Sequence, residues 1–258
     1  MASNIPNLIV IGAEDAGMAV LCRYLAAHPD VELRTADSRF FTADRSWSRG
    51  IEGYRALFEG RARISAECAP SCTQFPRIDG VPGRIRKALP EVRLLYLVCD
   101  PVERIVSAWL RRVKLGRERR SFRAALATLR DNAYVDASRY HLQLEQFWKH
   151  FPASQVQVLV LEDLVRAPRQ TLLAIWDFLG VDPAASTAPA AEPRGEEPAF
   201  PVWSRVATWL RRKVGTEIPA ATRPLIGVDL RSQLERALAD DLARLRSTTG
   251  LPLADWTL

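Results

Sequence analysis

The sequence is poor in the residues and runs that define several specialised classes of protein. Its 258 residues include only four cysteines, three histidines and two methionines. Its longest apolar runs extend over about half a dozen residues, whereas a membrane-spanning helix needs about 20. The N-terminal stretch MASNIPN carries no basic residue ahead of the first apolar run, which is unlike a secretory signal. We therefore expect no membrane segment and a cytoplasmic location.

The cysteines lack the paired CxxC spacing that is typical of structural zinc sites. Because disulfides are rare in the cytoplasm, we expect all four to be reduced, buried thiols. We also expect no metal site. The four residues are Cys22, Cys68, Cys72 and Cys99.

The overall composition is that of an ordinary globular protein with an excess of positive charge. Hydrophobic residues make up 48% of the chain and charged residues 26%, which excludes disorder as a description of the whole. Lys and Arg outnumber Asp and Glu by 36 to 30, a formal net charge of +6 with a sequence pI near 9.4. This balance favours anionic partners, such as phosphates, sulfates, nucleic acids or acidic lipids, without choosing among them.

Short apolar runs alternate with segments of helical periodicity, which predicts an α/β fold with a parallel sheet and a single domain over residues 1–258. We expect strands at 7–12, 31–35, 62–66, 92–98 and 155–161. We expect helices at 17–28, 48–58, 81–89, 101–115, 136–151, 168–180, 201–213 and 229–249. A Pro- and Ala-rich stretch at about 182–201 is expected to form an exposed loop or lid, or a passive linker.

The first strand is followed by a loop with phosphate-binding spacing. Gly12 and Gly17 are separated by four residues and precede a helix, so backbone amides and the helix N-terminus can face an anion. The confirming motif, GxxxxGK[ST], requires a lysine and a hydroxyl directly after the second glycine. Met18 and Ala19 stand there instead. A ligand-free turn between strand and helix explains the spacing equally well.

Two acids lie inside this loop, Glu14 and Asp15. A carboxylate about 4 Å from a phosphate costs roughly 4 kcal/mol at an effective dielectric near 20. The loop by itself therefore predicts weak or absent binding of a nucleotide.

The segment VCDPVERIVSAW, residues 98–109, predicts a second helix that begins at the end of a buried strand. Asp100 is a good N-cap, Pro101 suits the first helical position, and Glu103 can close a capping box. The carboxyl ends of parallel strands are where open α/β sheets bind ligands. The helix is expected to bury Ile105, Val106, Trp109 and Val113 and to expose a dense basic run: Arg104, Arg111, Arg112, Lys114, Arg117, Arg119, Arg120 and Arg123.

In order and spacing, these segments resemble the sulfotransferases that use 3′-phosphoadenosine 5′-phosphosulfate (PAPS), most closely their bacterial and heparan-sulfate-type branch. The resemblance covers nearly the whole chain and is carried by IGAEDAGMAVLCRYLAAHPDV, WSRGIEGYRALF, AECAPSC, RLLYLVCDPVERIVSAW, RYHLQLEQFWKHFP, QVQVLVLEDLVRAPRQTL and FLGV. It implies a P-loop-like parallel sheet flanked by helices. It also implies sulfuryl transfer from PAPS to a hydroxyl or amine of a small molecule or glycan, with no metal.

Position by position, the resemblance implies a donor site from which several cationic residues have been lost. The family's lysine of the 5′-phosphosulfate loop corresponds to Asp15, its two threonines to Met18 and Ala19, and the leading arginine of its 3′-phosphate motif to Cys99. The implied donor site comprises Gly12, Asp15, Ala16, Gly17, Met18, Ala19, Cys99, Arg104, Ser107, Arg212 and Lys213.

The resemblance also implies two catalytic carboxylates. Asp37 replaces the glutamate that commonly serves as the base for the acceptor, and Glu67 retains the acid of a second motif in which Cys68 replaces a lysine.

Three functions are compatible with these residues. The chain is a divergent sulfotransferase that binds PAPS or its product PAP weakly, or an enzyme that runs different chemistry in the same cleft, for example through a Cys99 thiolate, or a non-catalytic binding or scaffold protein. The expected partner is a small-molecule or anionic acceptor. No motif for specific nucleic-acid binding is present, and the oligomeric state stays open, a homo-oligomer included.

Overall fold

The structure is a computed structural model that describes residues 5–60, 62–187, 223–253 and 256. Most of the predicted loop or lid, the helix expected at 201–213, and the candidate donor residues Arg212 and Lys213 lie outside the described residues.

Five parallel strands form one sheet, in the order β2-β3-β1-β4-β5. They are β1 (Leu8–Gly12), β2 (Val31–Arg34), β3 (Ile64–Cys68), β4 (Arg93–Val98) and β5 (Val156–Val160). The three inner strands are buried along almost their whole length, as expected for a parallel sheet covered on both faces. The predicted α/β fold is confirmed.

The third strand lies two residues later than predicted, because it runs on through Glu67. A charged residue inside a strand does not fit an apolar pattern. The Ser38 amide and the Tyr54 hydroxyl donate hydrogen bonds to the Glu67 carboxylate, and these bonds make its burial possible.

The longer helices follow the predicted segments closely: α1 (Met18–Ala26), α4 (Val81–Ala88), α5 (Pro101–Lys114), α8 (Tyr140–Trp148), α10 (Pro168–Leu179) and α12 (Val228–Thr249). The helix predicted at 48–58 is shorter, α3 (Ile51–Arg55), because Gly50, which directly precedes it, has a φ of 82°. The short helix α2 (Asp44–Trp47) lies before the predicted range and was not predicted. The helix predicted at 136–151 is preceded by a separate turn, α7 (Ala133–Asp136). Two further short helices, α6 (Phe122–Ala125) and α9 (Leu161–Arg166), were not predicted.

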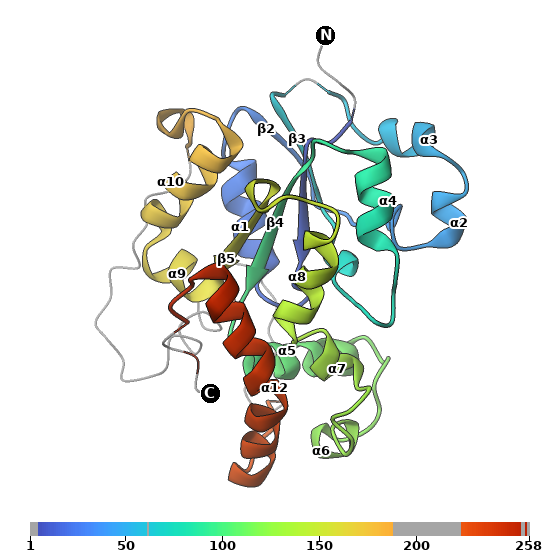
Figure 1. Cartoon of the computed structure of the whole chain (residues 1–258), viewed down its shortest axis with the longest axis vertical. Helices are drawn as coiled ribbons and strands as arrows, with labels where there is room; N and C mark the ends of the chain where they lie inside the picture. Colours follow the sequence, from blue (N-terminus) through green and yellow to red (C-terminus); the bar gives the residue numbers. More distant parts are fainter. Residues whose placement is uncertain (1–4, 61, 188–222, 254–255, 257–258) are drawn as a thin grey trace.

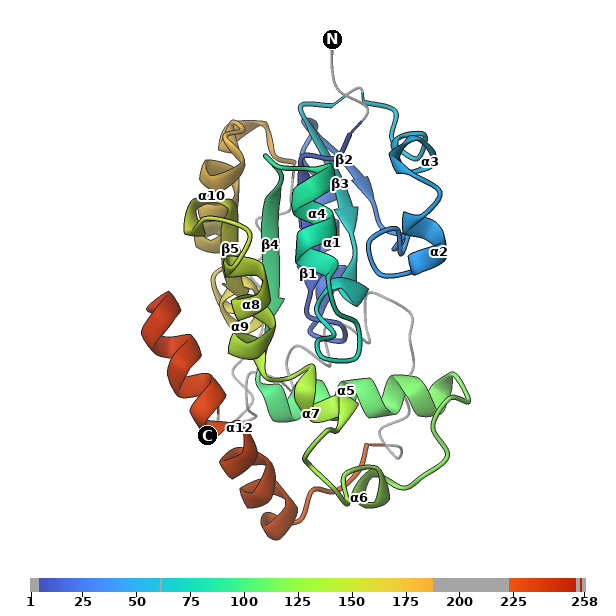
Figure 2. The same cartoon turned by 45° about the vertical axis from the view of Figure 1, so that its right-hand side comes forward.

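The helices form layers around the sheet. In Figure 1, α4 and α8 lie in front of the sheet and α1 lies behind it. The right-handedness of parallel crossovers gives the same arrangement. The crossover from β1 to β2 through α1 and the crossover from β3 to β4 through α4 run in opposite directions along the sheet, so the two helices cover opposite faces. Figure 2 shows α5 running across the carboxyl ends of the strands, with α12 beside it. This edge of the sheet therefore collects the loops that follow β1, β2, β3 and β4.

The prediction of four free thiols is wrong for two of the cysteines. Cys22 on α1 and Cys68 at the end of β3 form a disulfide across 46 residues of sequence. No local spacing rule signals such a pair, because the fold alone brings α1 against the end of β3. Cys72 and Cys99 are free and buried, as predicted.

The described part of the chain lacks two features that characterise other classes of protein. No group of three or more His, Cys, Asp or Glu residues there is arranged to hold a metal ion. No helix among those residues combines the length and the apolar character needed to cross a bilayer.

Candidate active site

The loop after β1 makes two close backbone approaches that require glycine. A Cβ on Gly12 would lie 2.1 Å from the Thr73 hydroxyl oxygen, and a Cβ on Gly17 would lie 2.7 Å from Leu161. Both residues have positive φ, 148° and 80°. The helix α1 begins directly afterwards, at Met18, and within the described residues no side chain caps its first turn. The predicted loop and helix N-terminus are thus present.

The two acids of the loop are held by arginines of α5. Arg111 forms ion pairs with both, through its Nε to Asp15 at 2.6 Å and through a terminal nitrogen to Glu14. Arg104 donates from Nε to the Glu14 carbonyl oxygen at 2.9 Å, and Gln74 donates to the Glu14 carboxylate at 2.5 Å. The side chain of Asp15 is only 10% exposed. The negative charge that the sequence places in the loop is therefore largely compensated from within the molecule.

Burial and the two arginines act in opposite directions on the Asp15 carboxyl. Burial raises its pKa, and the charges of Arg104 and Arg111 offset part of that rise. The ionised form of Asp15 therefore depends on these two arginines.

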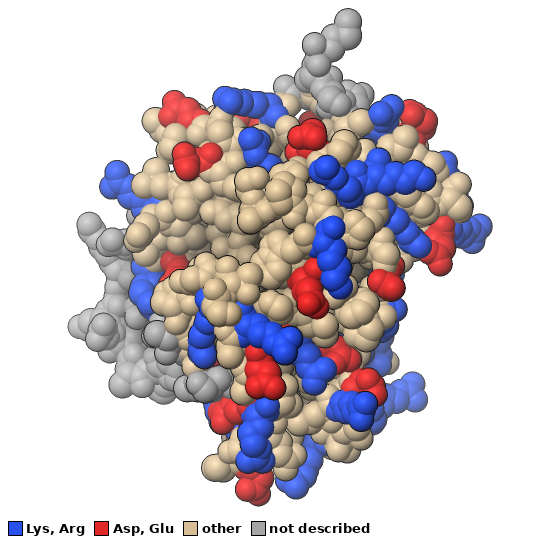
Figure 3. Space-filling model, in the orientation of Figure 1, with Lys and Arg blue, Asp and Glu red and all other residues tan. Residues whose placement is uncertain are grey.

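More arginines surround the loop than its two acids require. Arg77, in the loop after β3, has a pKa lowered by partial desolvation and by the repulsion of Arg112, Arg104 and Arg39, while the charge of Glu14 opposes this. Arg77, Arg104 and Arg111 thus act electrostatically on the two loop acids, with Arg39 and Arg112 near Arg77, and a bound anion would relieve the repulsion among these arginines. On the face shown in Figure 3, Lys and Arg over α12 are interspersed with Asp and Glu.

The start of α5 differs in part from the prediction. Asp100 caps the helix as expected, accepting hydrogen bonds from the amides of Val102 at 2.8 Å and Glu103 at 3.1 Å. Glu103 does not close the capping box. It pairs with Arg223 at 2.5 Å, while Glu162 accepts the Asp100 amide at 2.9 Å. Glu162 comes from the neighbouring strand end, which a local motif could not indicate.

The two faces of α5 also need correction. Val113 is 39% exposed and lies outside the buried stripe. Arg104 is only 3% exposed and belongs to the interior, where it also donates to the Tyr134 carbonyl oxygen at 3.0 Å. It is therefore not part of a solvated basic face.

The other predicted donor residues are placed unevenly around this loop. Ala16 is buried inside it, Met18 is half-buried, and Ala19 is exposed on the first turn of α1. Ser107 is half-buried, one turn after Arg104 on α5.

Cys99 is enclosed by the protein. It has no exposed surface, and Tyr140 donates to its carbonyl oxygen at 3.0 Å. Burial and the nearby charges of Glu162 and Asp100 raise the pKa of the Cys99 thiol well above its ordinary value. This geometry argues against the hypothesis of an activated thiolate at Cys99.

The two candidate catalytic carboxylates lie close together after β2 and at the end of β3. Glu67 has no exposed surface and accepts the Ser38 amide at 2.6 Å and the Tyr54 hydroxyl at 2.6 Å. Burial is the main cause that raises the pKa of Glu67, and the charge of Asp37 raises it further. Both oxygens of Glu67 are therefore committed to holding neighbouring segments.

Asp37 is the more accessible of the two acids. It is half-buried, and its oxygens accept the Arg39 amide at 2.8 Å and the Ser71 amide at 3.1 Å. These bonds fix the carboxylate at the carboxyl edge of the sheet, and Glu67 fixes the adjacent Ser38. The arrangement suits Asp37 as a general base and Glu67 as a positioning residue.

Three residues organise this site beyond the predicted ones: Arg111, which was expected only as part of the basic run after Arg104, and Gln74 and Tyr54, which were not assigned. A signal existed only for Arg111, which lies seven residues after Arg104 and hence on the same face of α5. Gln74 and Tyr54 act through contacts across 60 and 13 residues of sequence, and no periodicity marks them.

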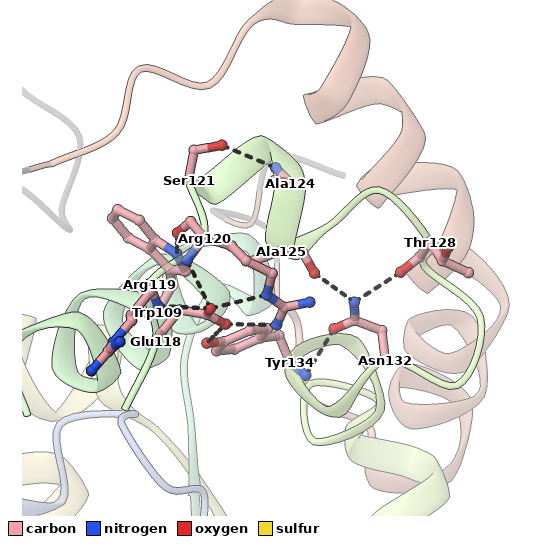
Figure 4. A network of polar contacts seen from close by, with 10 residues as sticks. All are labelled: Trp109, Glu118, Arg119, Arg120, Ser121, Ala124, Ala125, Thr128, Asn132 and Tyr134. Carbon is pink, nitrogen blue, oxygen red and sulfur yellow. Dashed lines mark hydrogen bonds and ion pairs between the residues drawn. The ribbon is translucent and has the colours of Figure 1, made fainter. Parts of the chain in front are cut away.

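A separate polar network fixes the chain between α5 and α7 (Figure 4). Glu118 accepts hydrogen bonds from the Arg120 side chain at 2.6 and 2.9 Å and from the Tyr134 hydroxyl at 3.0 Å. The bond to Arg120 is the main reason that the pKa of Glu118 is lowered to about 2. The Tyr134 carbonyl oxygen accepts from Arg104, which in turn donates to Glu14 of the donor loop, so this network supports the loop indirectly.

Comparisons with known proteins agree with this geometry. Residues 72–185 match the family described as "Sulfotransferase family". Mouse heparan sulfate glucosamine 3-O-sulfotransferase 3B1 is 30% identical over 189 residues, which are 70% of this chain and 47% of that protein. The chain thus spans about half the length of the curated relatives it matches.

Solved structures resemble the whole chain. A sulfotransferase from Alicyclobacillus acidocaldarius superimposes with a TM-score of 0.73 at 24% identity, covering 98% of this chain and 99% of that one. The sulfotransferase domain of the curacin biosynthetic pathway has a TM-score of 0.57 at 16% identity, covering 93% and 98%.

Proposed function

Because the chain belongs to the sulfotransferase family, we propose that it transfers a sulfuryl group from PAPS to a hydroxyl or amine of a small molecule or glycan. The observation that carries this proposal is the engagement of Glu14 and Asp15 by Arg111 and Arg104. Asp15, which stands at the position of the family's lysine, and the neighbouring Glu14 are both paired, and Arg77 adds positive charge near Glu14.

The residues present fit the two ends of the donor unequally. At the 5′ end, Gly17 allows close approach and the uncapped N-terminus of α1 offers amides to an anion. At the 3′ end, Cys99 is enclosed and Arg104 is occupied by backbone carbonyls, which leaves the Ser107 hydroxyl as the predicted contact within the described part of the chain. We therefore expect weak binding of the donor, dominated by its 5′ end.

The residues of this chain have separable roles in the reaction. PAPS supplies the sulfuryl group and leaves as PAP. Asp37 accepts the proton that the acceptor hydroxyl loses as its oxygen attacks sulfur, while the amides of Arg39 and Ser71 hold the carboxylate in place. Arg111 balances the loop acids, so that negative charge developing on the leaving phosphate is not repelled.

A second candidate function is binding of a nucleotide or anionic partner without turnover. One observation favours it: the charge of Arg111 is already committed to two carboxylates and cannot act fully on a leaving group. Different chemistry through cysteine is less well supported, since Cys99 is enclosed and Cys68 is in a disulfide.

Titration of the protein with PAP, followed by calorimetry, tests the proposed site. Arg111→Ala leaves two acids without their partner and is expected to weaken PAP binding about tenfold, equivalent to roughly 1.4 kcal/mol. Arg117→Ala is the matched control, because Arg117 is exposed just beyond the end of α5. Absence of binding by the unaltered protein at millimolar PAP, or equal affinities for both variants, would contradict the proposal.

Asp37→Asn distinguishes an enzyme from a binding protein. For an enzyme, we expect sulfuryl transfer to fall at least 100-fold, the usual contribution of a general base, with PAP affinity unchanged. Transfer that is detectable and insensitive to this substitution would remove Asp37 as the base, and binding without any transfer would favour the second candidate.

A further inference from the structure

The Cys22–Cys68 disulfide joins the two parts of the candidate site. Cys22 lies in the second turn of α1, the helix that follows the donor loop, and Cys68 is the last residue of β3. The chain thus contains one covalent link between the donor side and the side that carries the carboxylates.

The segment around Cys68 contacts both candidate catalytic acids. Glu67 directly precedes it and holds Ser38 and Tyr54. Beyond it, the Ala69 amide donates to Val10 of β1 at 2.9 Å, and the Ser71 amide donates to Asp37. A shift of Cys68 relative to α1 would therefore be felt by Asp37, Glu67 and the donor loop together.

The disulfide is reachable even though both cysteines are mostly buried. Cys22 is 8% exposed and Cys68 is 3% exposed. Both line a hollow of about 400 Å³, whose other walls are Met18, Ala19, Arg23, Ala26, Thr35 and Pro70. A hollow of this size can hold a small thiol beside the two cysteines. The hollow touches the first turn of α1, where the donor loop ends.

We propose that Cys22–Cys68 is a reversible redox modification site that controls the alignment of α1 with the end of β3. A dithiol reductant attacks one sulfur atom as its thiolate and forms a mixed disulfide, releasing the other cysteine. The second thiolate of the reductant then displaces the protein sulfur. In sum, the dithiol is oxidised to its disulfide, and two electrons and two protons pass to Cys22 and Cys68 as free thiols.

The free cysteines of this chain serve as internal controls. Cys72 and Cys99 are buried, and neither lines this hollow. A dithiol acting through the hollow is expected to leave both unchanged.

Thiol counting by mass spectrometry tests the link itself. The protein is first treated with oxidised glutathione. One sample is then denatured and alkylated with iodoacetamide directly, and a second is exposed to dithiothreitol while folded before it is denatured and alkylated. We expect two alkylated cysteines before reduction and four afterwards, with a peptide pair joined through Cys22 and Cys68 only before. Four alkylated cysteines under both conditions, or a different linked pair, would overturn the proposal.

Hydrogen exchange tests the consequence for the site. Reduction is expected to increase amide exchange in α1 and in residues 67–71, and to lower the melting temperature by roughly 5–15 °C, the range for loss of a native disulfide. The double variant Cys22→Ser/Cys68→Ser should behave like the reduced protein and no longer respond to dithiothreitol, whereas Cys72→Ser should respond like the unaltered protein. Unchanged exchange after complete reduction would show that the link controls nothing.

PAP affinity in the two redox states separates this proposal from the proposed function. If the chain uses PAPS, we expect reduction to weaken PAP binding at least threefold. If PAP binds in neither state, the proposed function fails, while thiol counting and hydrogen exchange still decide whether the redox site exists.

Discussion

At the scale of single residues, the most informative side chain is Glu67, because a fully buried carboxylate has to be explained by its partners. Ser38 and Tyr54 satisfy its two oxygens, yet burial still raises its pKa. The Glu67 carboxyl group therefore holds two segments together, and its burial disfavours its ionised form. This combination is expected of a group that positions a loop rather than one that exchanges protons with a substrate.

Glu67→Gln is expected to change how stability depends on pH. A carboxyl whose folded pKa is raised above its ordinary value of 4.5 stabilises the fold fully below that value and loses this contribution as pH rises through the folded pKa. Melting temperatures of the unaltered protein, relative to Glu67→Gln, should thus fall as pH rises above about 4.5. The exposed Glu145→Gln is the control, and parallel curves for the Glu67 variant and the unaltered protein would refute the interpretation.

Glu67→Leu tests the positioning role directly. It leaves the Ser38 amide and the Tyr54 hydroxyl without an acceptor, and we expect a loss of about 3 kcal/mol in the free energy of unfolding. Denaturant unfolding at neutral pH measures it. A loss below about 0.5 kcal/mol would mean that water replaces the carboxylate easily.

At the scale of elements, what the sequence could predict depended on how local the cause was. The strands were found because buried parallel strands are continuous apolar runs, and the start of α5 was found because Asp100 and Pro101 are adjacent to it. The partner of the Asp100 amide was missed, since Glu162 lies 62 residues away and reaches it only in the folded sheet. The helix predicted at 48–58 begins only at Ile51, because of the backbone conformation of Gly50.

The candidate site follows the same rule. Gly12, Gly17 and Asp37 could be proposed from the sequence because each belongs to a short local motif that resembles a family motif. The ion pair between Asp15 and Arg111 could not be assigned from the sequence, because it joins two elements whose approach only the fold determines. The Cys22–Cys68 disulfide and the Gln74 contact were missed for the same reason.

The segment between α5 and α7 provides a prediction about an element held by one acid. Since the pKa of Glu118 is lowered to about 2, its contribution to stability is present above the ordinary glutamate value near 4.5 and is lost as pH falls through the folded value. Glu118→Gln should therefore increase amide exchange across residues 116–125 at pH 7, after correction for intrinsic rates. The difference from the unaltered protein should shrink between pH 4.5 and 2.

Glu52→Gln is the control for this effect, because Glu52 is 79% exposed and its ion pair is with Arg55, one turn away in α3. Equal exchange in the Glu118 variant and the unaltered protein at pH 7 would mean that the segment is held by its apolar contacts alone, chiefly Phe122 against Trp109.

At the scale of the whole molecule, the last described helix, α12, packs against both α5 and α8. Helix α12 presents a stripe of leucines, Leu234, Leu238, Leu242 and Leu245, each without exposed surface. Its Asp241 accepts the amides of His141 and Leu142, both at 2.9 Å, at the start of α8. A helix far along the chain therefore completes the support of the candidate site, since α8 carries Tyr140, which contacts Cys99 at the end of β4.

Leu238→Ala measures how strongly the folding of the molecule depends on this helix. Removing a fully buried leucine side chain is expected to cost about 3 kcal/mol in the free energy of unfolding, within the 2–5 kcal/mol usual for such a change. The control is Leu225→Ala at a fully exposed position just before the helix, where the expected change is below about 0.5 kcal/mol. If α12 is part of one cooperative core, the Leu238 variant unfolds in a single transition at lower denaturant with the same slope. Two transitions, with α12 released first, would instead make the helix an independently stable appendage and would remove its role in supporting the carboxyl edge of the sheet.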